Sequence, residues 1–402
     1  MARARSLDQP LALRLVSGAA LALWVLVAGF PLFWIAAMSF KLPLDAFSAN
    51  PLRVIFGPGT LRTAGGISLA GIAATLLALY IAYRSGRRLG SFATRLGDAG
   101  RGLTGWLIAG AALVAGVVLL FLVLLPLAAR ALEGAFGAIP GLEVLAEPVL
   151  GLTMQNYRSV WIDRAFYRQF LNSMLVTAGV VTVSLTVGTL AGYGLARTRT
   201  NLAFWLLIIA LAFRAMPHSV LVAGYLPAFI NSREILAPLW QNAVTGSVLR
   251  LFSAEAPTFY GQPLAVIAVL VAINQPFTIW MLRSFFANIP AELDEAARVD
   301  GCSHFEAFRR VIIPVMWPGV ITTGLFSFLL AYNDYLVTAL LLDAQSLTMV
   351  PTISQFLSSE NNATDQLLAI AAAVSITAPL FLLVLVFQRH IVGGLTQGAV
   401  KG

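Results

Sequence analysis

The sequence of 402 residues has little charge and almost no cysteine. Its single cysteine, Cys302, excludes an internal disulfide. Charged residues make up 11% of the chain, whereas soluble domains carry about 25%. Apolar residues make up 59%, and the mean hydropathy is +0.84. This composition argues against an ordinary soluble domain and predicts an all-α integral membrane protein.

Motifs for catalysis are also missing from the sequence. It has no glycine-rich phosphate loop with a following lysine, no cluster of His, Cys or Asp with metal-ligand spacing, and no serine-nucleophile motif. Gly192-Tyr193-Gly194 is too short for a nucleotide-binding loop and predicts a close helix contact or the end of a span. The net charge of +8 does not indicate nucleic acid, because no basic patch is interleaved with aromatic residues. We therefore expect no enzyme activity, bound cofactor or metal in this chain.

Long apolar stretches predict about eight membrane spans, since one span needs about 20 mostly apolar residues. The second predicted span, 66–83, is the shortest. If the N-terminus is cytoplasmic, most Lys and Arg residues fall in cytoplasmic segments, as the positive-inside rule requires. Both termini are then cytoplasmic, and the arginines between residues 84 and 101 anchor the chain at anionic lipid headgroups. The predicted spans are about 16–38, 66–83, 103–127, 172–194, 203–228, 262–283, 318–340 and 367–388.

A polar, amphipathic segment separates the sixth and seventh predicted spans. Pro290 and the acidic residues that follow it are typical of a helix start. Gly301 supplies a turn, and Phe305, Phe308 and Val311 rebuild an apolar stripe that leads to a proline at position 314. The pattern predicts two short helices broken at Gly301, presented to a soluble protein in the cytosol.

The same segment resembles the EAA loop of ABC importer permeases. The pattern is Glu295-Ala296-Ala297, three residues, Gly301, nine residues, and then Val311-Ile312-Ile313-Pro314. The flanking segments resemble the MalG-type branch of carbohydrate permeases, and the likeness covers about 16–43 and 156–402. These segments are Phe277–Phe286, Ala331–Leu336 and Gln388–Gly402.

This resemblance implies a type I ABC importer permease core of six transmembrane helices. The two remaining spans then belong to an insertion, which keeps the EAA loop (near 288–314) on the cytoplasmic side. We expect an N-terminal tail and first helix over 1–43, an inserted region over 44–150, and the permease core over 151–402.

The resemblance also implies partners in a bacterial inner membrane. The chain would be the transmembrane subunit that forms the translocation pathway for a carbohydrate, an oligosaccharide or a glucoside. It would pair with a homologous second permease, an ABC ATPase dimer that uses ATP and Mg, and a periplasmic or lipid-anchored solute-binding protein. The residues expected to couple it to the ATPase are Glu295, Ala296, Ala297, Asp300, Gly301, Pro314 and, in the C-terminal tail, Lys401.

Polar residues inside predicted spans are candidates for the pathway, because such groups are costly in lipid. Arg214 lies in the middle of span five, next to a Met-Pro pair whose Pro217 can kink the helix. Arg214 could instead form a structural pair with Asp334 or with a partner subunit. Amide and aromatic side chains suit sugar rings, but they could also serve helix packing. The expected pathway residues are Arg214, Asn274, Tyr332, Asn333 and Asp334.

The external loop over 343–366 has acidic residues and no Lys or Arg. By the resemblance, we expect Glu360, Asn361 and Asn362 to contact the binding protein; a solvated connector is the alternative. Three alternative functions differ in substrate, energy source or class. The importer could carry a phosphorylated polyol or another polar solute. A secondary transporter would need inverted repeats and leaves the EAA segment unexplained. A membrane enzyme lacks a catalytic constellation.

Overall fold

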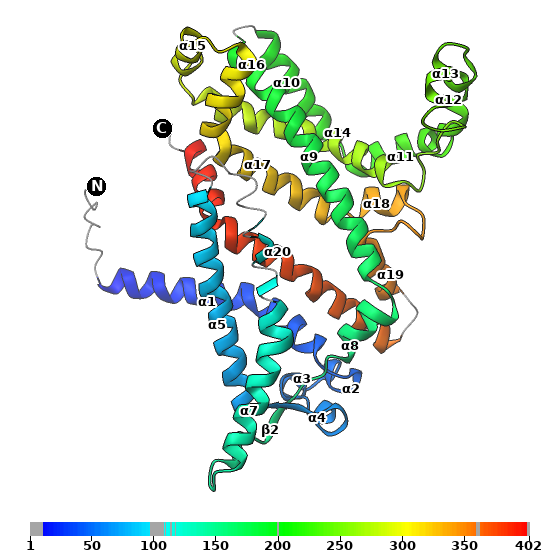
Figure 1. Cartoon of the computed structure of the whole chain (residues 1–402). Helices are drawn as coiled ribbons and strands as arrows, with labels where there is room; N and C mark the ends of the chain where they lie inside the picture. Colours follow the sequence, from blue (N-terminus) through cyan, green and yellow to red (C-terminus); the bar gives the residue numbers. More distant parts are fainter. Residues whose placement is uncertain are drawn as a thin grey trace. The chain divides into compact units, whose positions relative to one another are not determined.

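The computed structural model describes residues 11–96, 108, 110–112, 115–116, 118–198, 201–358 and 362–399. Helices dominate these residues (Figure 1). The predicted all-α membrane class is therefore confirmed, apart from one small two-stranded sheet. The chain divides into two compact units. Unit 1 comprises Met1–Arg164 with Phe356–Val386, and unit 2 comprises Ala165–Gln355 with Phe387–Gly402.

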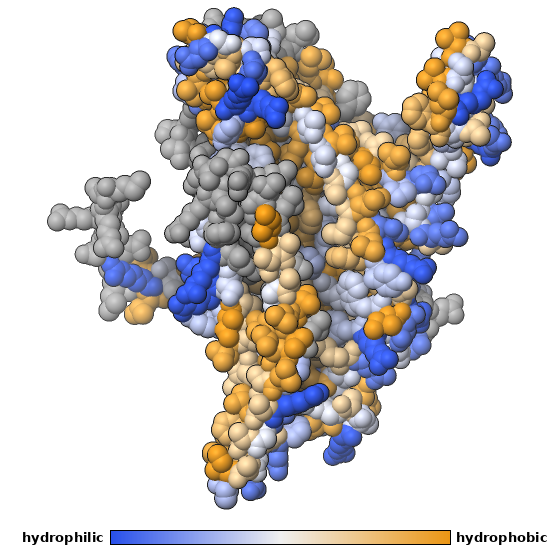
Figure 2. Space-filling model, in the orientation of Figure 1, coloured by the Kyte–Doolittle hydropathy of each residue, from blue (hydrophilic) through white to orange (hydrophobic). Residues whose placement is uncertain are grey.

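Unit 1 contains two long apolar helices, α1 and α5, and a set of short elements between and after them. Figure 2 shows a mostly apolar surface along the part of this unit that carries α5 and α7. The elements are α1 (Leu11–Ser39), α2 (Pro43–Ala46), α3 (Pro51–Phe56), α4 (Pro58–Ala64), β1 (Gly66–Ser68), α5 (Leu69–Leu96), η2 (Leu120–Leu124), α7 (Leu125–Gly137), η3 (Glu143–Leu145), β2 (Pro148–Gly151), α8 (Gln155–Arg158) and η4 (Ser159–Asp163). The long helix α20 (Ala363–Ala399) begins in unit 1.

A buried polar network holds the short elements of unit 1 together. Lys41 and Asp45 are 1% and 2% exposed. The Lys41 ammonium donates to the carbonyl of Gly151 on β2, which pairs antiparallel with β1. The Asp45 carboxylate accepts bonds from the backbone N–H and the hydroxyl of Thr60. The Asn156 amide donates to the carbonyls of Ser39 and Lys41, each at 2.8 Å. The end of α1 is therefore tied to α4, β2 and α8.

Unit 2 contains the closely packed helices α9, α14 and α17 and the EAA loop. Its elements are α9 (Tyr167–Arg197), α10 (Asn201–Arg214), α11 (His218–Ile230), α12 (Ser232–Gln241), α13 (Thr245–Leu249), α14 (Pro263–Ala287), α15 (Glu292–Val299), α16 (His304–Ala307), η5 (Phe308–Ile312), α17 (Ile313–Tyr332), α18 (Leu336–Leu341) and α19 (Met349–Ser358), whose last residues belong to unit 1.

Helices α9 and α14 pack closely because α9 carries a row of small residues. Ser184, Gly188 and Gly192 are four residues apart and buried. A Cβ at Gly188 would lie 2.5 Å from the Thr278 side chain, and one at Gly192 would lie 3.0 Å from the Arg283 nitrogen. Small residues at this spacing let membrane helices approach each other. The close helix contact predicted at Gly192 is confirmed.

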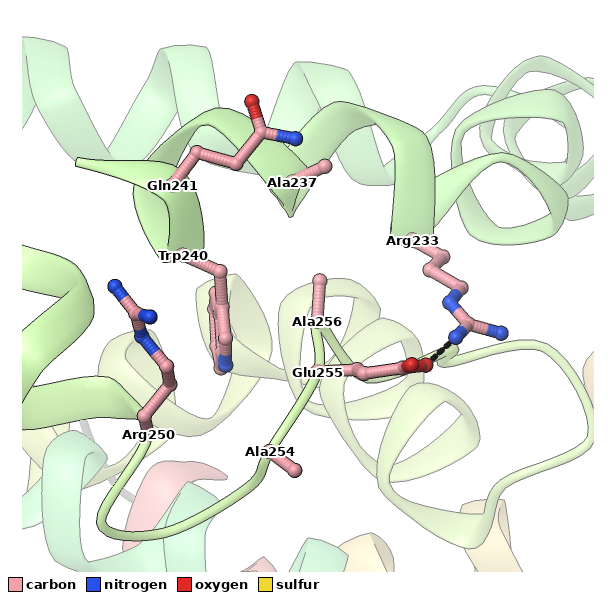
Figure 3. Close-up of a pocket in the computed structure, with 8 residues that line it drawn as sticks. All are labelled: Arg233, Ala237, Trp240, Gln241, Arg250, Ala254, Glu255 and Ala256. Carbon is pink, nitrogen blue, oxygen red and sulfur yellow. Dashed lines mark ion pairs between the residues drawn. The ribbon is translucent and has the colours of Figure 1, made fainter.

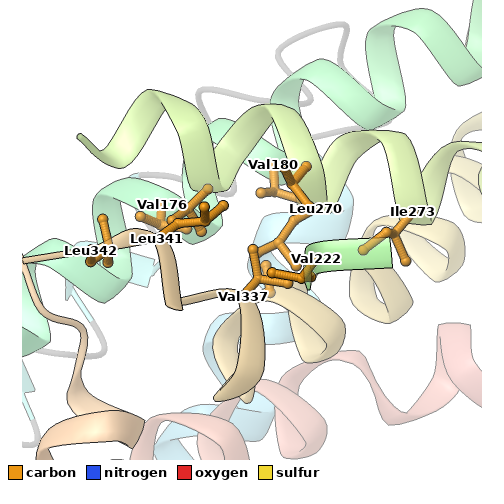
Figure 4. Close-up of a cluster of buried hydrophobic side chains, with 11 residues drawn as sticks. Val176, Val180, Val222, Leu270, Ile273, Val337, Leu341 and Leu342 are labelled. Carbon is orange, nitrogen blue, oxygen red and sulfur yellow. The ribbon is translucent and has the colours of Figure 1, made fainter. Parts of the chain in front are cut away.

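An apolar core joins α9 and α14 to α11, α17 and α18. Figure 4 shows that its side chains come from segments far apart in the sequence. Within lipid such a core is stabilised by van der Waals contact rather than by exclusion of water. It therefore fixes α11 and α18, which are too short to span a membrane, against the longer helices. Its members are Val176, Val180, Val222, Val266, Val269, Leu270, Ile273, Ala331, Val337, Leu341 and Leu342.

Six helical stretches among the described residues are long and apolar enough to cross a membrane. They match six of the eight predicted spans, and the predicted third span, 103–127, lies largely outside the described residues. The six stretches are Ala12–Ser39, Leu69–Arg88, Tyr167–Arg197, Pro263–Ala287, His304–Tyr332 and Ala363–Phe381. The division at residues 43 and 150 concerns an insertion into the family's core and stays a prediction.

Two predicted spans are interrupted. The fifth, 203–228, is not one helix but α10 and α11, because Pro217 has no N–H and disfavours a helical conformation at the residue before it. The seventh, 318–340, ends at Tyr332 and resumes as α18. We name residues 215–217 the α10–α11 break and residues 333–335 the α17–α18 break. Asn333 and Asp334 therefore lie between helices rather than deep inside one.

Candidate functional site: the EAA loop and the helix breaks

The first half of the EAA loop is the amphipathic helix α15, which ends at a glycine turn. Gly301 has φ +89°, a left-handed value that favours glycine. The N–H of Gly301 bonds to the Arg298 carbonyl and that of Cys302 to the Ala297 carbonyl, both at 3.0 Å. This pair of bonds is a Schellman motif, which closes a helix end and reverses the chain. The predicted turn at Gly301 is confirmed.

The second half of the loop starts with a capping box. The Ser303 hydroxyl accepts the Glu306 backbone N–H, and the Glu306 carboxylate accepts the Ser303 N–H at 3.0 Å. The helix then widens to a π-helical turn at η5 and enters α17, with Pro314 in the first turn of that helix. The predicted second helix is confirmed, and it continues directly into a membrane span.

The loop presents an exposed surface that is partly apolar. Glu295, Ala296, Asp300 and Gly301 are exposed, whereas Ala297 is buried. Val299 is 88% exposed and Phe305 64% exposed, although both are apolar. The apolar side predicted for α15 is therefore divided, since Ala297 packs inward while Val299 remains available to another protein.

Two residues that sequence reasoning did not single out hold the loop in place. Tyr193 and Arg197 lie one helical turn apart at the end of α9, and both contact Asp294 of α15. The sequence signal that could have identified these contacts is the i, i+4 spacing of a tyrosine and an arginine at the end of a predicted span.

The α17–α18 break carries two of the five predicted pathway residues, Asn333 and Asp334, and a third, Tyr332, is the last residue of α17. Asn333 is exposed, and its amide donates to the Leu329 carbonyl at 3.0 Å. The Asp334 carboxylate accepts the backbone N–H of Thr338 at 2.9 Å and so caps α18. Tyr332 is 1% exposed and stacks on the Phe328 ring, with centroids 5.0 Å apart. The amide and the carboxylate are thus at the break, while the tyrosine packs inside the unit.

The α10–α11 break places Arg214 and His218 on either side of Pro217. The Arg214 guanidinium lies 4.6 Å from the centroid of the Phe277 ring on α14. No ion pair between Arg214 and Asp334 is found among the residues with described side chains. His218, the first residue of α11, is exposed, and α11 packs against α18, the helix that follows Asp334. His218 is not among the predicted pathway residues, because α18 belongs to a span that is distant in the sequence.

Asn274 lies apart from both breaks and links two helices. It is 1% exposed on α14, and its amide donates to the Ser327 hydroxyl on α17 at 2.8 Å. A polar contact of this kind between membrane helices contributes roughly 0.6–2 kcal/mol. This position is that of a helix-packing residue, which was the alternative interpretation of Asn274.

The loop over 343–366, which is predicted to be external, is partly helical. Its first half is attached to the start of α9, where Ser173 accepts the Met349 N–H at 2.9 Å and Asn172 donates to the Leu347 carbonyl at 3.1 Å. Asn362 is exposed and accepts the Thr364 N–H, so it caps α20. Glu360, Asn361 and, at the other end of the chain, Lys401 lie outside the described residues.

A pocket of about 400 Å³ lies on the α12–α13 hairpin, away from every predicted site residue. Figure 3 shows the Trp240 ring between Arg250 on one side and the Arg233–Glu255 ion pair on the other. The indole N–H donates to the Ser253 carbonyl at 3.0 Å. Most of the lining side chains are exposed, so this pocket is a groove on the surface of the hairpin.

Comparison with known proteins places the EAA loop and both helix breaks inside one conserved domain type. Residues 184–397 match the family model described as binding-protein-dependent transport system inner membrane component. A trehalose transport system permease protein of Mycobacterium tuberculosis is 30% identical over 253 residues, which are 62% of this chain and 83% of that protein. A diacetylchitobiose uptake system permease protein of Streptomyces coelicolor is 31% identical over 62% of this chain and 82% of its own length.

A solved bacterial ABC transporter that imports the polysaccharide alginate is also similar, with 18% identity, a TM-score of 0.42, and coverage of 69% of this chain and 97% of that one. This score is too low to add to the sequence match. The family match covers more than half of the chain and includes the complete EAA loop. The chain belongs to the family of binding-protein-dependent transport system inner membrane components, the permeases of ABC importers.

Proposed function

We propose that this permease imports a carbohydrate, an oligosaccharide or a glucoside, and that the ATPase activity resides in a separate partner subunit that uses ATP and Mg. The EAA loop carries this proposal, because its exposed Val299 and Phe305 form a surface for a soluble protein. Relatives named for trehalose and diacetylchitobiose transport support a sugar substrate. The family match argues against the alternative function of a secondary transporter.

The assembly in this proposal is a heterodimer of homologous permeases with an ATPase dimer and a solute-binding protein. Both termini and the EAA loop face the cytoplasm, because Lys and Arg residues concentrate in the segments that this orientation places inside. In the same orientation, the tip of the external loop around Asn362 faces the binding protein. Lys401 adds a basic group near the ATPase.

The pathway in this proposal runs along the two helix breaks. Asn333, Asp334 and His218 are polar and not fully buried within the chain, and lipid contact would cost a few kcal/mol for a charged group. An aqueous path or the partner permease avoids that cost. Arg214 borders this path, while Tyr332 and Asn274 support it from inside the helix packing.

Uptake by the reconstituted complex tests the proposed function. Proteoliposomes holding the permease pair, the ATPase and the binding protein are supplied with trehalose, maltose, chitobiose or a phosphorylated polyol. We expect ATP-dependent accumulation of a sugar that stops when the ATPase is omitted. Accumulation of the polyol alone would replace the carbohydrate assignment, and accumulation driven by an ion gradient without ATPase would contradict the proposal.

Labelling tests the pathway separately. A cysteine at Asn333, in a Cys302→Ser background, should react with a small water-soluble thiol reagent to different extents with and without ATP. A cysteine at Asn274 is the matched control and should stay unlabelled, because that position is buried. Reaction of the Asn333 position with lipid-soluble reagents alone would contradict the assignment.

A further inference from the structure

Three side chains meet where α15 of the EAA loop contacts the end of α9. The Tyr193 hydroxyl lies 2.5 Å from one carboxylate oxygen of Asp294, and the Arg197 guanidinium lies 2.6 Å from the other. The Arg197 contact has the distance of an ion pair but not the angle of a hydrogen bond. We name these three residues the loop anchor.

The loop anchor also reaches the end of α14. The Arg197 guanidinium donates to the carbonyls of Phe286 and Ile289, at 3.4 and 3.1 Å. It also lies over the Tyr193 ring, 5.8 Å from its centroid. These carbonyls are at the negative end of the α14 dipole, where a cation is stabilised. One arginine thus connects the ends of two membrane helices to α15.

Packing of aromatic rings surrounds these polar contacts. The Tyr193 ring lies 5.5 Å from Phe286 and 4.8 Å from Phe308 of η5, between ring centroids. Phe286 and Phe308 belong to an apolar cluster that also includes Leu282, Ile289, Ile312 and Met316. The cluster shields the anchor on one side, so its contacts are stronger than those of a pair in open solvent.

Burial distinguishes the anchor from the other ion pair of the loop. The side chains of Arg197 and Asp294 are 23% and 15% exposed. Those of Arg310 and Glu306 are 69% and 42% exposed, lie 3.3 Å apart, and join residues of a single helical segment. An exposed pair of this kind contributes little. Of these two ion pairs, that of Arg197 is the one that links the loop to α9.

From this geometry we infer that Tyr193 and Arg197 are positioning residues, which fix the EAA loop to the end of α9 through Asp294. When the ATPase displaces α15, α9 and α14 then move with it, and the helices beside the pathway are displaced. The movement of α9 and α14 with the ATPase rests on the proposed function. The attachment of the loop to α9 is a property of the chain itself and can be tested without transport.

The mobility of the loop tests the anchor without reference to transport. Cys302 is the only cysteine of the chain, partly exposed, and next to the turn at Gly301. A nitroxide label on Cys302 reports loop motion in the full chain, held in lipid nanodiscs with cysteine-free partner subunits. Asp294→Asn removes the charge, and Tyr193→Phe removes one hydroxyl while keeping the ring. Arg310→Gln is the matched control.

We expect the mobile fraction of the label to rise roughly fivefold in Asp294→Asn, the factor that corresponds to about 1 kcal/mol. Tyr193→Phe should give a smaller rise and Arg310→Gln none. In proteoliposomes, sugar uptake per ATP hydrolysed should fall in the same order, while the ATPase subunits still copurify. If Asp294→Glu restores coupling, the carboxylate itself is required, and a general loss of structure is not the cause of the defect in Asp294→Asn.

The outcomes separate this inference from the proposed function. An immobile label in Asp294→Asn and Tyr193→Phe overturns the anchor, even if ATP drives uptake. Loss of ATPase copurification with unchanged uptake per ATP in the remaining complexes also overturns it, because the anchor then serves only assembly. A label that becomes mobile in a complex without ATP-driven uptake keeps the anchor and contradicts the proposed function.

Discussion

Replacing Gly301 with alanine should loosen the EAA loop through backbone strain alone. Gly301 has φ +89°, and a Cβ built on it meets no atom within 4 Å. The substitution therefore adds no steric clash with its surroundings. An L-residue in left-handed conformation costs about 1–2 kcal/mol. We expect the ordered turn to be destabilised by that amount, which corresponds to a factor of roughly 5–30 in the ratio of ordered to disordered turn.

Two further variants isolate the cause. Asparagine adopts the left-handed conformation more readily than alanine, so Gly301→Asn should have a smaller effect. Gly194→Ala is the matched control, because Gly194 lies inside α9, has no positive φ, and also meets no atom within 4 Å. Alanine in a helix interior is favoured over glycine by roughly 0.5–1 kcal/mol.

Binding of the purified ATPase subunit to the permease pair in nanodiscs provides the assay. If the ordered turn is required for docking, Gly301→Ala should raise the Kd by at most about 5–30-fold, because the Kd rises as the ordered fraction of the turn falls. Gly301→Asn should raise it less, and Gly194→Ala should leave it unchanged. Equal Kd values for Gly301→Ala and Gly194→Ala would refute the argument that the left-handed turn builds the docking surface.

Three other predictions concern unit 1 and the external loop. Asp45→Ala should destabilise the chain by about 1–3 kcal/mol in thermal unfolding, because it leaves the buried Thr60 N–H and hydroxyl without their acceptor, whereas the exposed Glu143→Ala should change stability little. Burial lowers the pKa of Lys41 below its ordinary value of 10.5. The folded state then binds fewer protons than the unfolded state between the two pKa values, so stability should rise with pH in that window, and Lys41→Met should remove this slope. Deleting 358–362 should lower stimulation of ATP hydrolysis by the binding protein and leave basal hydrolysis unchanged; full stimulation would indicate a plain connector.

Local patterns predicted the EAA loop well. The acidic first turn of α15, the turn at Gly301 and the return of apolar residues before Pro314 are short-range signals, and each appears in the structure. The contacts of the loop could not be predicted in the same way. Asp294 meets Tyr193 and Arg197 across about a hundred positions of sequence, and no local periodicity records such a pairing.

Hydropathy predicted where apolar segments lie but not where they break. A window over 318–340 averages the polar Asn333 and Asp334 with many apolar neighbours, so one long span was predicted where the structure has α17 and α18. Pro217 did signal a kink, but the sequence did not show that the kink is a full interruption, with α10 ending at Arg214 and α11 beginning at His218. The contact between α11 and α18 joins the helices that follow these two interruptions.

Cross-linking from the EAA loop tests the central claim most directly. A photoreactive side chain at Val299, which is 88% exposed, is placed in the assembled complex and irradiated. The same group at Leu44, which is 72% exposed in the segment predicted to be external, is the control. If the EAA loop docks on the ATPase, Val299 yields a covalent adduct with the ATPase subunit and Leu44 yields none. An adduct from Val299 only to lipid or to the permeases would contradict the account.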